Sequence, residues 1–377
     1  MAVCPKCRST GPKAEQCPRD GLHFVDEAVL ANAPEGHLLG LTIGRKFVPM
    51  EILGEGGMGF IYKSIQKPVG RMVALKVLKD NYMHDEVIRD RFLREAEVIA
   101  KLNHRNIVML FDSGLDENTG VLYMAMEFLS GKSVDKEVSQ NISLQRIVSI
   151  CTGIAAALAE AHKHGIIHRD LKPENVFLVL DEDGKEVSKV LDFGFARLQG
   201  ATKKLTQAGI AFGTPHYMAP EQAMGLETIT SAADVYSLGI MMFELVTGQV
   251  PYDGVHAMEI MNKQVNAPIP TPQPRPGLKT PMRMLQLIEA CMQKEPEDRP
   301  ADGATVLAEL QRVQEDIENS SAILTAHVPL PQPVPQAAPP VAGGGGLKPQ
   351  QLVLLIGGAV AFLLLGVIIA LLLSRIT

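Results

Sequence analysis

Two short motifs constrain the fold and the chemistry of this chain more than any other feature. Residues 168–175 read His-Arg-Asp-Leu-Lys-Pro-Glu-Asn, and the sequence Asp-Phe-Gly begins at Asp192. Asp170 can orient and deprotonate a hydroxyl, Lys172 can bind a phosphate, and Asn175 can bind a metal ion together with Asp192. Phosphoryl transfer needs these groups together, because its catalysis consists mostly of positioning and charge neutralisation. A chance match would explain either motif alone, but not both in the same order with the features below.

A glycine-rich segment precedes both motifs. Residues 54–61 read Gly-Glu-Gly-Gly-Met-Gly-Phe-Ile, and glycines let a backbone approach phosphates without a clash of Cβ atoms. Dinucleotide-binding folds and ordinary turns share the Gly-x-Gly-x-x-Gly pattern. Here the segment joins two strand-like runs rather than a strand and a helix, which disfavours the dinucleotide interpretation.

A lysine ends the strand-like run Val-Ala-Leu-Lys at residues 73–76. Lysines in strands usually lie at a solvated edge, but Lys76 follows the glycines inside an apolar run, so we expect it to reach the α- and β-phosphates of a nucleotide. Its expected partner is Glu95 on the following helical segment. Glu97 is the competing candidate, but it points to another face of that helix.

These motifs resemble those of the protein kinase superfamily. The sequence Lys-Pro-Glu at 172–174 is similar to the Ser/Thr branch, and Gly-Glu-Gly-Gly-Met-Gly is similar to the bacterial, Hanks-type group. The resemblance covers residues 47 to about 313. It implies an α+β fold with a small β-rich lobe, a large helical lobe and ATP in the cleft between them, to which the chain would add a single C-terminal transmembrane helix.

The resemblance implies a role for each motif residue. Asp170 would orient or accept the proton of the substrate hydroxyl, and Lys172 would contact the γ-phosphate, with Lys76 and Glu95 completing the catalytic set. The expected ligands of Mg²⁺, or of Mn²⁺ in its place, are Asn175 and Asp192. The residues expected to bind ATP are Leu53, Gly54, Glu55, Gly56, Gly57, Met58, Gly59, Phe60, Ile61, Ala74, Lys76, Met126, Glu127, Leu129 and Phe177.

Residues 192–221 resemble a kinase activation segment. Arg169, beside the expected catalytic Asp, resembles the arginine of kinases that are switched on by phosphorylation, because a guanidinium can hold a phosphate through two hydrogen bonds. Thr202 and Thr206 are the expected autophosphorylation sites. Thr214 is expected to have a mainly structural role near the substrate.

Further expectations concern the large lobe. The resemblance implies a buried ion pair between Glu221 and Arg299, and it implies that Asp234 anchors the backbone of the catalytic loop. His162 and His164 match no motif, and we interpret them as ordinary surface or helix-end residues.

Hydrophobic periodicity predicts the main elements around these motifs. Ser143 is a plausible N-cap for the longer of two predicted helices, and the region after residue 221 is mostly helical in pattern. Strands are predicted at 47–53, 60–66, 73–78, 108–111 and 121–128, and helices at 86–102 and 143–164.

The five cysteines fall into two classes. Cys4, Cys7 and Cys17 lie close together, and an odd total with such a cluster argues against a secreted disulfide framework. Cys151 and Cys291 lie alone in apolar helical patterns, where a cysteine usually acts as a small buried hydrophobic residue.

The first 25 residues resemble a small zinc ribbon. Cys-Pro pairs begin at Cys4 and Cys17, and Asp20 stands where a fourth cysteine would be expected, with His23 three residues later. Since zinc accepts sulfur, nitrogen or oxygen ligands, either Asp20 or His23 could complete a structural site with Cys4, Cys7 and Cys17. A metal-free knuckle is the main alternative. A redox Cys-x-x-Cys motif is a further alternative, but the surrounding sequence does not resemble a thioredoxin.

An apolar segment near the C-terminus predicts membrane attachment. Leu352–Leu373 contains 22 residues without a charge, and a helix of that length spans about 33 Å, close to a hydrocarbon core of about 30 Å. A buried core helix is the weaker alternative, because this run is apolar on every face. With no signal-like stretch at the N-terminus, we expect a single-pass cell-membrane protein with its kinase domain in the cytoplasm.

The expected organisation has five parts: a zinc-ribbon-like module at 1–25, a linker at 26–44, a protein kinase domain at 45–319, a Pro/Gly-rich linker at 320–350 and a transmembrane helix at 351–373. A net charge of −6 with mixed signs does not favour nucleic acid as a partner. The expected partners are protein substrates, the membrane and a second copy in a homodimer. The alternative function is a pseudokinase or membrane scaffold that binds partners through the cysteine module.

Overall fold

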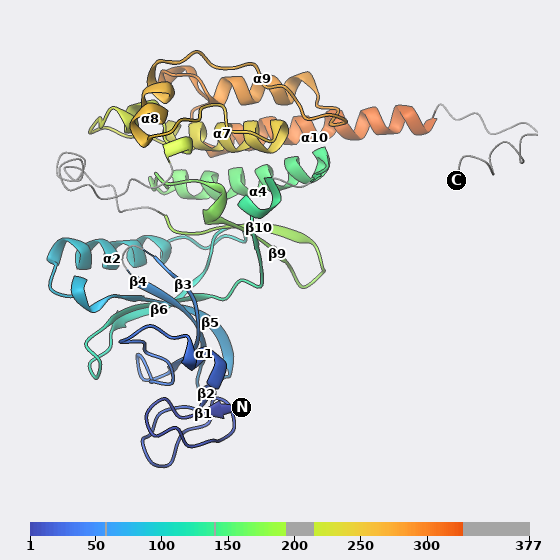
Figure 1. The fold of residues 1–377 in the computed structure, drawn as a ribbon. Helices are drawn as coiled ribbons and strands as arrows, with labels where there is room; N and C mark the ends of the chain where they lie inside the picture. Colours follow the sequence, from blue (N-terminus) through green and yellow to red (C-terminus); the bar gives the residue numbers. More distant parts are fainter. Residues whose placement is uncertain (57–58, 139–140, 194–214, 327–377) are drawn as a thin grey trace, which may run out of the picture. The chain divides into compact units, whose positions relative to one another are not determined.

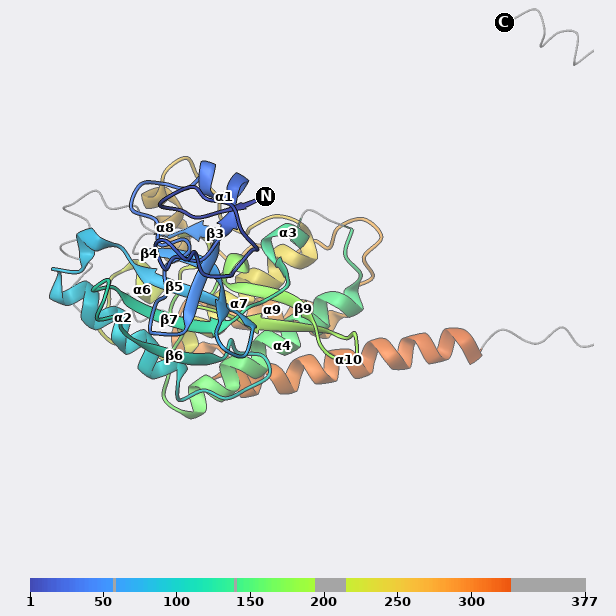
Figure 2. The same ribbon diagram turned by 90° about the horizontal axis from the view of Figure 1, so that it is seen from below.

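The computed structural model describes residues 1–56, 59–138, 141–193 and 215–326 (Figure 1). Almost all of these residues belong to one compact unit, residues 1–323. Within it a β-sheet lobe and a helical lobe are stacked in Figure 1, and Figure 2 looks along the stack from below, so that the two lobes overlap in that view. The expected two-lobed α+β architecture is confirmed for these residues.

A five-stranded antiparallel sheet forms the small lobe, with the strand order β3-β4-β5-β7-β6. Its side chains alternate between the two faces as strand geometry requires: in β5, Val73, Leu75 and Val77 are buried on one side, while Ala74 and Lys76 point to the other. Helix α2 packs against β6 and β7. The elements are β3 (Phe47–Glu55), β4 (Gly59–Gln66), β5 (Arg71–Leu78), α2 (Glu86–Ile99), β6 (Leu110–Leu115) and β7 (Leu122–Glu127).

These elements lie close to the predicted ranges, with one informative shift. A strand was predicted at 108–111, but β6 begins at Leu110. The backbone of Val108 pairs with the other lobe instead: its N–H donates to the carbonyl of Val190 at 3.0 Å, and the N–H of Val190 donates to the carbonyl of Asn106 at 2.8 Å. Residues 106–108 therefore attach the small lobe to the large one.

The large lobe is built on helices and a small three-stranded sheet. Helix α4 begins after Ser143, whose side chain accepts a hydrogen bond from the N–H of Arg146 as predicted for an N-cap. Helix α7 is buried on nearly every face, which explains its almost unbroken apolar sequence. The elements are β8 (Gly131–Ser133), α3 (Asp135–Val138), α4 (Leu144–Lys163), β9 (Val176–Leu180), β10 (Glu186–Val190), α6 (Pro220–Ala223), α7 (Ala232–Thr247), α8 (Ala257–Asn266), α9 (Met282–Cys291) and α10 (Gly303–Ala326). Short 3₁₀ turns cover Asp80–Tyr82, Pro173–Asn175, Pro215–Tyr217 and Pro296–Asp298.

The N-terminal residues form an additional layer on the small lobe. Strand β1 (Ala2–Val3) pairs with β2 (Val25–Asp26), and helix α1 (Glu27–Ala31) follows. Residues 26–44 were expected to be a linker, but Leu30, Leu39 and Ile43 are buried in the same hydrophobic cluster as the sheet. This segment therefore packs against the lobe, because its apolar side chains cover the face of the sheet that α2 leaves free.

Among the described helices, α4 alone has the length and hydropathy of a membrane span. Ten of its residues are buried in the core of the large lobe, so it is a core helix of that lobe. The transmembrane helix predicted at 351–373 lies outside the described residues.

Candidate active site

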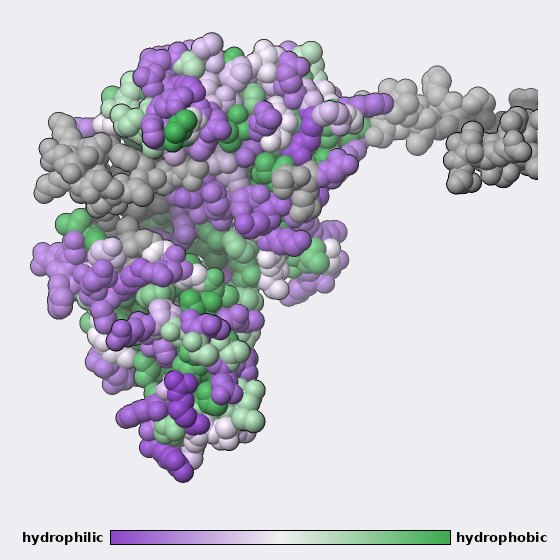
Figure 3. Space-filling view, viewed as in Figure 1, coloured by the Kyte–Doolittle hydropathy of each residue, from purple (hydrophilic) through white to green (hydrophobic). Residues whose placement is uncertain are grey.

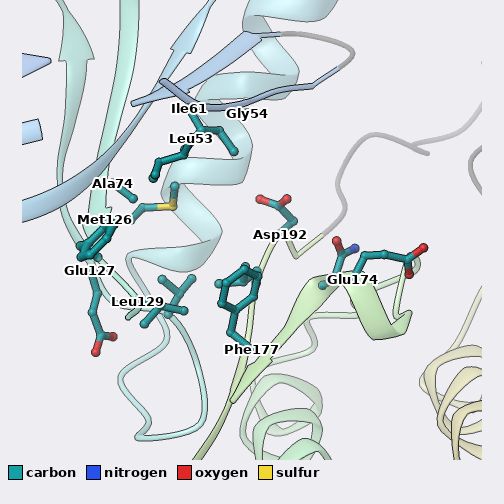
Figure 4. Close-up of a pocket in the computed structure, with 14 residues that line it drawn as sticks. Leu53, Gly54, Ile61, Ala74, Met126, Glu127, Leu129, Glu174, Phe177 and Asp192 are labelled. Carbon is teal, nitrogen blue, oxygen red and sulfur yellow. The ribbon is translucent and has the colours of Figure 1, made fainter. Parts of the chain in front are cut away.

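A pocket of about 270 Å³ lies between the two lobes. Its walls are mostly apolar, as is usual for a site that binds a small molecule. Figure 4 shows Leu53 and Ile61 from the strands β3 and β4 on one side and Phe177 from β9 on the other. Asp192 stands at one end of the pocket and Glu127 at another. The full lining is Leu53, Gly54, Ile61, Ala74, Val108, Met126, Glu127, Phe128, Leu129, Glu174, Asn175, Phe177, Leu191 and Asp192.

The structure brings together most of the residues predicted to bind ATP. Eight of them line the pocket: Leu53, Gly54, Ile61, Ala74, Met126, Glu127, Leu129 and Phe177. Five others are not part of its lining: Glu55, Gly56, Gly59, Phe60 and Lys76. The predicted residues Gly57 and Met58 lie outside the described residues.

Phe128 lines the pocket as part of the hinge at 127–129, where the resemblance implied an adenine contact. Sequence reasoning missed Val108, Glu174 and Leu191 as lining residues. Leu191 adjoins the predicted residue Asp192, and Glu174 belongs to the 168–175 motif, so their neighbours provided a signal. Val108 carried no such signal, because its place depends on the backbone pairing with Val190 across the lobes.

Lys76 forms ion pairs with two carboxylates beside this pocket. Its Nζ lies 2.6 Å from Oε1 of Glu95 and 3.2 Å from Oδ1 of Asp192. Glu97 is exposed on the other side of α2, so the pair forms with Glu95, as its position on the helix indicated. One side chain thus links the small lobe, helix α2 and the Asp-Phe-Gly motif.

The electrostatics of this group follow from burial and proximity. Burial disfavours the charged form of Lys76, but the carboxylates of Asp192 and Glu95 outweigh that effect and raise the lysine's pKa. The positive charge of Lys76 lowers the pKa of Asp192. Burial raises the pKa of Glu95, against the opposing effect of Lys76. Asp192 is therefore held ionised, which suits a ligand for a divalent cation.

The loop at 168–175 gathers the other predicted catalytic and metal-binding groups. Nζ of Lys172 lies 3.0 Å from Oδ2 of Asp170. The side-chain amide of Asn175 donates to the backbone carbonyl of Asp170 at 2.8 Å, and Asn175 also lines the pocket with Asp192. The carboxamide of Asn175 and the carboxylate of Asp192 supply oxygen atoms of the kind that Mg²⁺ prefers.

Asp234 holds this loop from within the large lobe. Its carboxylate is fully buried and accepts hydrogen bonds from the backbone N–H groups of His168 at 2.7 Å and Arg169 at 2.8 Å. Arg169 adopts a positive φ of 65°, a strained backbone conformation for a non-glycine residue. The two hydrogen bonds to Asp234 stabilise that conformation.

His162 lies in the last turn of α4, as one of our two interpretations had it, but it takes part in the same network and is not an ordinary surface residue. Its side chain is buried, with Nε2 lying 2.9 Å from Oδ2 of Asp234. Nδ1 accepts a hydrogen bond from the N–H of Gly303 at 3.0 Å, so the ring proton is on Nε2 and is donated to Asp234. His164 does lie at the helix end, where it contacts Glu160. Spacing along the chain cannot reveal a contact with Asp234, which lies on another helix.

Glu221 and Arg299 form the ion pair that the resemblance implied. Both guanidinium nitrogens lie 2.9 Å from the carboxylate oxygens, and both side chains are buried. Arg299 also donates to the backbone carbonyls of Ala232, Gln293 and Lys294, so its remaining donors are satisfied. The predicted activation-segment residues Thr202, Thr206 and Thr214 lie outside the described residues.

Comparison with known proteins agrees with this geometry. The family described as "Protein kinase domain" matches residues 47–311. This chain belongs to the protein kinase family. It is 36% identical over 310 residues to the serine/threonine-protein kinase pkn3 of Myxococcus xanthus, covering 78% of this chain and 56% of that protein. It is 34% identical over 301 residues to the serine/threonine-protein kinase PrkC of Bacillus subtilis, covering 76% and 45%.

The kinase also resembles a solved structure. A crystal structure of a double mutant of the PknI kinase domain of Mycobacterium tuberculosis matches with a TM-score of 0.55 and 25% identity, over 73% of this chain and 97% of that one. The kinase spans about half the length of the curated relatives that it matches.

A second cluster of polar groups lies at the N-terminus of the kinase. One ligand atom from each of Cys4, Cys7, Cys17 and Asp20 lies within 4.8 Å of the others. The Sγ atoms of Cys7 and Cys17 are 3.7 Å apart, and Oδ2 of Asp20 lies 3.1 Å from Sγ of Cys4. Four-coordinate zinc with Zn–S bonds of about 2.3 Å holds its sulfur ligands about 3.8 Å apart, so this donor set fits zinc.

His23, the other candidate for the fourth ligand, is not part of this group. Its ring is buried, and Nδ1 lies 3.3 Å from the backbone carbonyl of Gly40. The structure therefore gathers Asp20, rather than His23, with the three cysteines. Cys151 and Cys291 are fully buried in the large lobe, as their apolar surroundings predicted.

Proposed function

We propose that this kinase transfers the γ-phosphate of ATP to Ser and Thr hydroxyls of proteins. The observation that carries this proposal is the pair of contacts from Lys76 to Glu95 and Asp192 beside the apolar pocket. ATP would place its adenine between the strands of the small lobe and Phe177, with its phosphates toward Lys76. Asn175 and Asp192 would hold Mg²⁺, which neutralises charge on the phosphates.

The chain's own residues account for the remaining steps. Asp170 would orient the substrate hydroxyl and accept its proton, since it lies in the same loop as the metal ligands. Lys172, 3.0 Å from the carboxylate of Asp170, would contact the phosphate that is transferred. Positioning of the two reactants, together with neutralisation of charge on the phosphates, accounts for most of the catalysis at such a site.

A radiolabelled ATP assay tests this function. The full chain, in Mg²⁺ and with a general protein substrate, should yield phosphoserine or phosphothreonine, and the Asp170→Asn variant should yield neither above background. A wild-type protein that binds Mg²⁺·ATP but transfers no phosphate would instead support the alternative, a pseudokinase or scaffold that binds partners through the cysteine module.

Activation by autophosphorylation is the second part of the proposal. The guanidinium of Arg169 forms no ion pair with any residue in the part of the chain that the structure describes, and Asp234 fixes its backbone. A phosphate on Thr202 or Thr206 would give this side chain a partner. Mass spectrometry of active enzyme should find one of the two threonines modified, and two unmodified threonines in active enzyme would contradict this mechanism.

Membrane tethering is the third part. Leu352–Leu373 would cross the cell membrane once and leave the kinase domain in the cytoplasm. Confinement at a surface raises the effective concentration of neighbouring copies, and small residues at Ala359, Gly366 and Ala370 would let two such helices pack as a homodimer. Deletion of 352–377 should release active kinase into the soluble fraction and slow its autophosphorylation. A truncated protein that still sediments with membranes would contradict the anchor.

A structural zinc ion is the fourth part. Cys4, Cys7, Cys17 and Asp20 supply four donors at distances that suit it. The ion would serve structure, because all four positions of a tetrahedral site would be filled by protein groups. Elemental analysis of protein purified without chelators should find about one zinc per chain, and a value near zero would exclude the site.

A further inference from the structure

We infer that metal binding at Cys4, Cys7, Cys17 and Asp20 clamps the N-terminal module onto the small lobe and thereby stabilises the ATP-binding strand β3. The inference rests on the zinc site proposed above and adds a function to it. The N-terminal module comprises residues 1–46, that is, the cysteine-containing residues 1–25 together with the segment up to β3 that packs against the sheet. It would act as a metal-dependent outer layer of the catalytic domain rather than as a separate binding domain.

The first observation is a shared hydrophobic core. Val3 and Val25, from the paired strands β1 and β2, belong to the same buried cluster as Phe47 and Met50 of β3. Two of the metal-binding cysteines, Cys4 and Cys17, lie in a separate small cluster with Ala2 and Phe24. The module thus has one face at the metal site and the other in the core of the lobe. Two adjacent residues of β1 belong to the two faces: Ala2 packs with the cysteines and Val3 packs in the core.

The second observation is a chain of backbone hydrogen bonds from the module into the sheet. The N–H of His23 donates to the carbonyl of Gly40 at 2.8 Å, and the N–H of Gly40 donates to the carbonyl of Pro49 in β3 at 2.9 Å. Gly40 has a positive φ of 77°, and a Cβ there would lie 2.5 Å from the carbonyl oxygen of His23 and 2.8 Å from Cγ of Pro5. The close approach of Pro5 and His23 to the segment that pairs with β3 therefore depends on this glycine.

Two further contacts reach β4 and the residues after it. Nζ of Lys67 donates to the carbonyl of Ala14 at 2.7 Å, and the N–H of Leu38 donates to the hydroxyl of Tyr62, a fully buried residue of β4, at 3.3 Å. The module is therefore attached to the first two strands of the sheet, and these strands carry the glycine-rich segment between them.

The third observation explains why a metal would control this attachment. Regular structure within the module is limited to two strands of two residues and one short helix, and its exposed tip is hydrophilic in Figure 3, with Lys6, Arg8, Glu15 and Arg19 on the surface. A segment this small buries too little apolar surface to fold by itself. For such segments the free energy of metal binding becomes free energy of folding.

The consequence for ATP follows from the path of β3. Its first half, with Met50, is buried under the module, and its second half, with Leu53 and Gly54, lines the pocket. Loss of the metal would loosen the module, expose the start of β3 and reduce the fraction of molecules whose pocket can bind ATP. The apparent affinity for ATP falls in proportion to that fraction.

The experiment compares variants of the full chain in detergent. Asp20→Ala removes one donor, Asp20→Cys replaces it by the thiolate common in zinc sites, and Arg19→Ala is a matched control at an exposed neighbouring position. We expect Asp20→Ala to lose zinc, to exchange the amides of residues 47–55 about tenfold faster, and to raise KM for ATP about threefold. Asp20→Cys and Arg19→Ala should retain zinc, and both should keep the wild-type rate of amide exchange at residues 47–55 and the wild-type KM for ATP.

Wild-type protein treated with a chelator provides a second route that needs no substitution. Exchange at 47–55 should accelerate and should return to its original rate when zinc is added back, even if Asp20→Ala does not accumulate. Zinc removal that leaves this exchange and KM for ATP unchanged would overturn the clamp while leaving the zinc site intact. Absence of zinc from every variant and from the wild type would overturn both the zinc site and the clamp. The proposed kinase activity does not depend on either and would stand.

Discussion

Nε2 of His162 donates a hydrogen bond to the fully buried carboxylate of Asp234 across 2.9 Å. The same carboxylate holds the backbone of the 168–175 loop at His168 and Arg169. His162 also receives the N–H of Gly303, so it connects the loop with the N-terminal end of α10. A residue without a motif thereby supports the anchor of the 168–175 motif.

Replacement of His162 by Ala should destabilise the kinase by about 1–3 kcal/mol, because it removes one hydrogen bond from the buried carboxylate of Asp234 and leaves the buried N–H of Gly303 without its partner. It should also lower kcat, since Asp234 then holds Arg169 less firmly. Thermal unfolding and steady-state kinetics measure the two effects. His164→Ala, at an exposed position two residues away, is the control and should change stability by less than about 0.5 kcal/mol. Equal effects of the two substitutions would contradict the role given to His162.

Asp170→Asn and Lys76→Met should each reduce phosphoryl transfer by about 100-fold or more. The first removes the group proposed to orient the substrate hydroxyl, and the second removes the cation between Glu95 and Asp192. Circular dichroism should remain that of the wild type. A folded variant that retains more than about a tenth of the activity would exclude its residue from catalysis.

Gln264 should position the loop that receives the protein substrate. Its side chain is fully buried, and its Nε2 donates to the backbone carbonyls of Pro215 and His216, which follow the activation segment's undescribed part. We expect Gln264→Ala to raise KM for a protein substrate about threefold to tenfold while KM for ATP stays the same. Asn266→Ala, on the same helix and exposed, should change neither constant. An equal rise in both KM values would indicate a general loss of structure instead.

Glu221→Gln should destabilise the large lobe by about 3–5 kcal/mol, because it leaves the buried guanidinium of Arg299 without its counter-charge. Arg312 and Glu309 form an exposed ion pair on α10, and Arg312→Ala should cost no more than about 1 kcal/mol. Chemical denaturation of the two variants gives the comparison. If both variants unfold at similar denaturant concentrations, burial does not determine how much the Glu221–Arg299 pair contributes to stability.

Local patterns predicted much of the fold. The alternation in 73–78 and the helical spacing in 86–102 depend only on which face of each element is buried, and the structure has β5 and α2 at these positions. The pairing of Lys76 with Glu95 also followed from helix geometry. Such features can be read from a sequence because they arise within one element or between two neighbouring ones.

Other features depend on contacts between distant residues and could not be predicted in this way. The burial of His162 results from its contact with α7, and the choice of Asp20 over His23 results from the contact of the His23 ring with the backbone carbonyl of Gly40. The packing of 26–44 arises because its few apolar residues meet a face of the sheet that no helix covers. In each case the deciding partner is far away in the sequence.

In the part of the chain that the structure describes, the backbone joins the two lobes at two places, and these determine how the lobes can move. One connection is the chain itself after β7, where Oε2 of Glu127 lies 2.7 Å from Nζ of Lys189 on β10. The other is the backbone pairing of 106–108 with Val190. Two fixed connections define a rotation axis, so the small lobe should rotate about this axis relative to the large lobe rather than translate along it. Because α2 lies next to one end of that axis, each rotation that opens the cleft between the lobes would move Glu95 and change its distance from the large lobe.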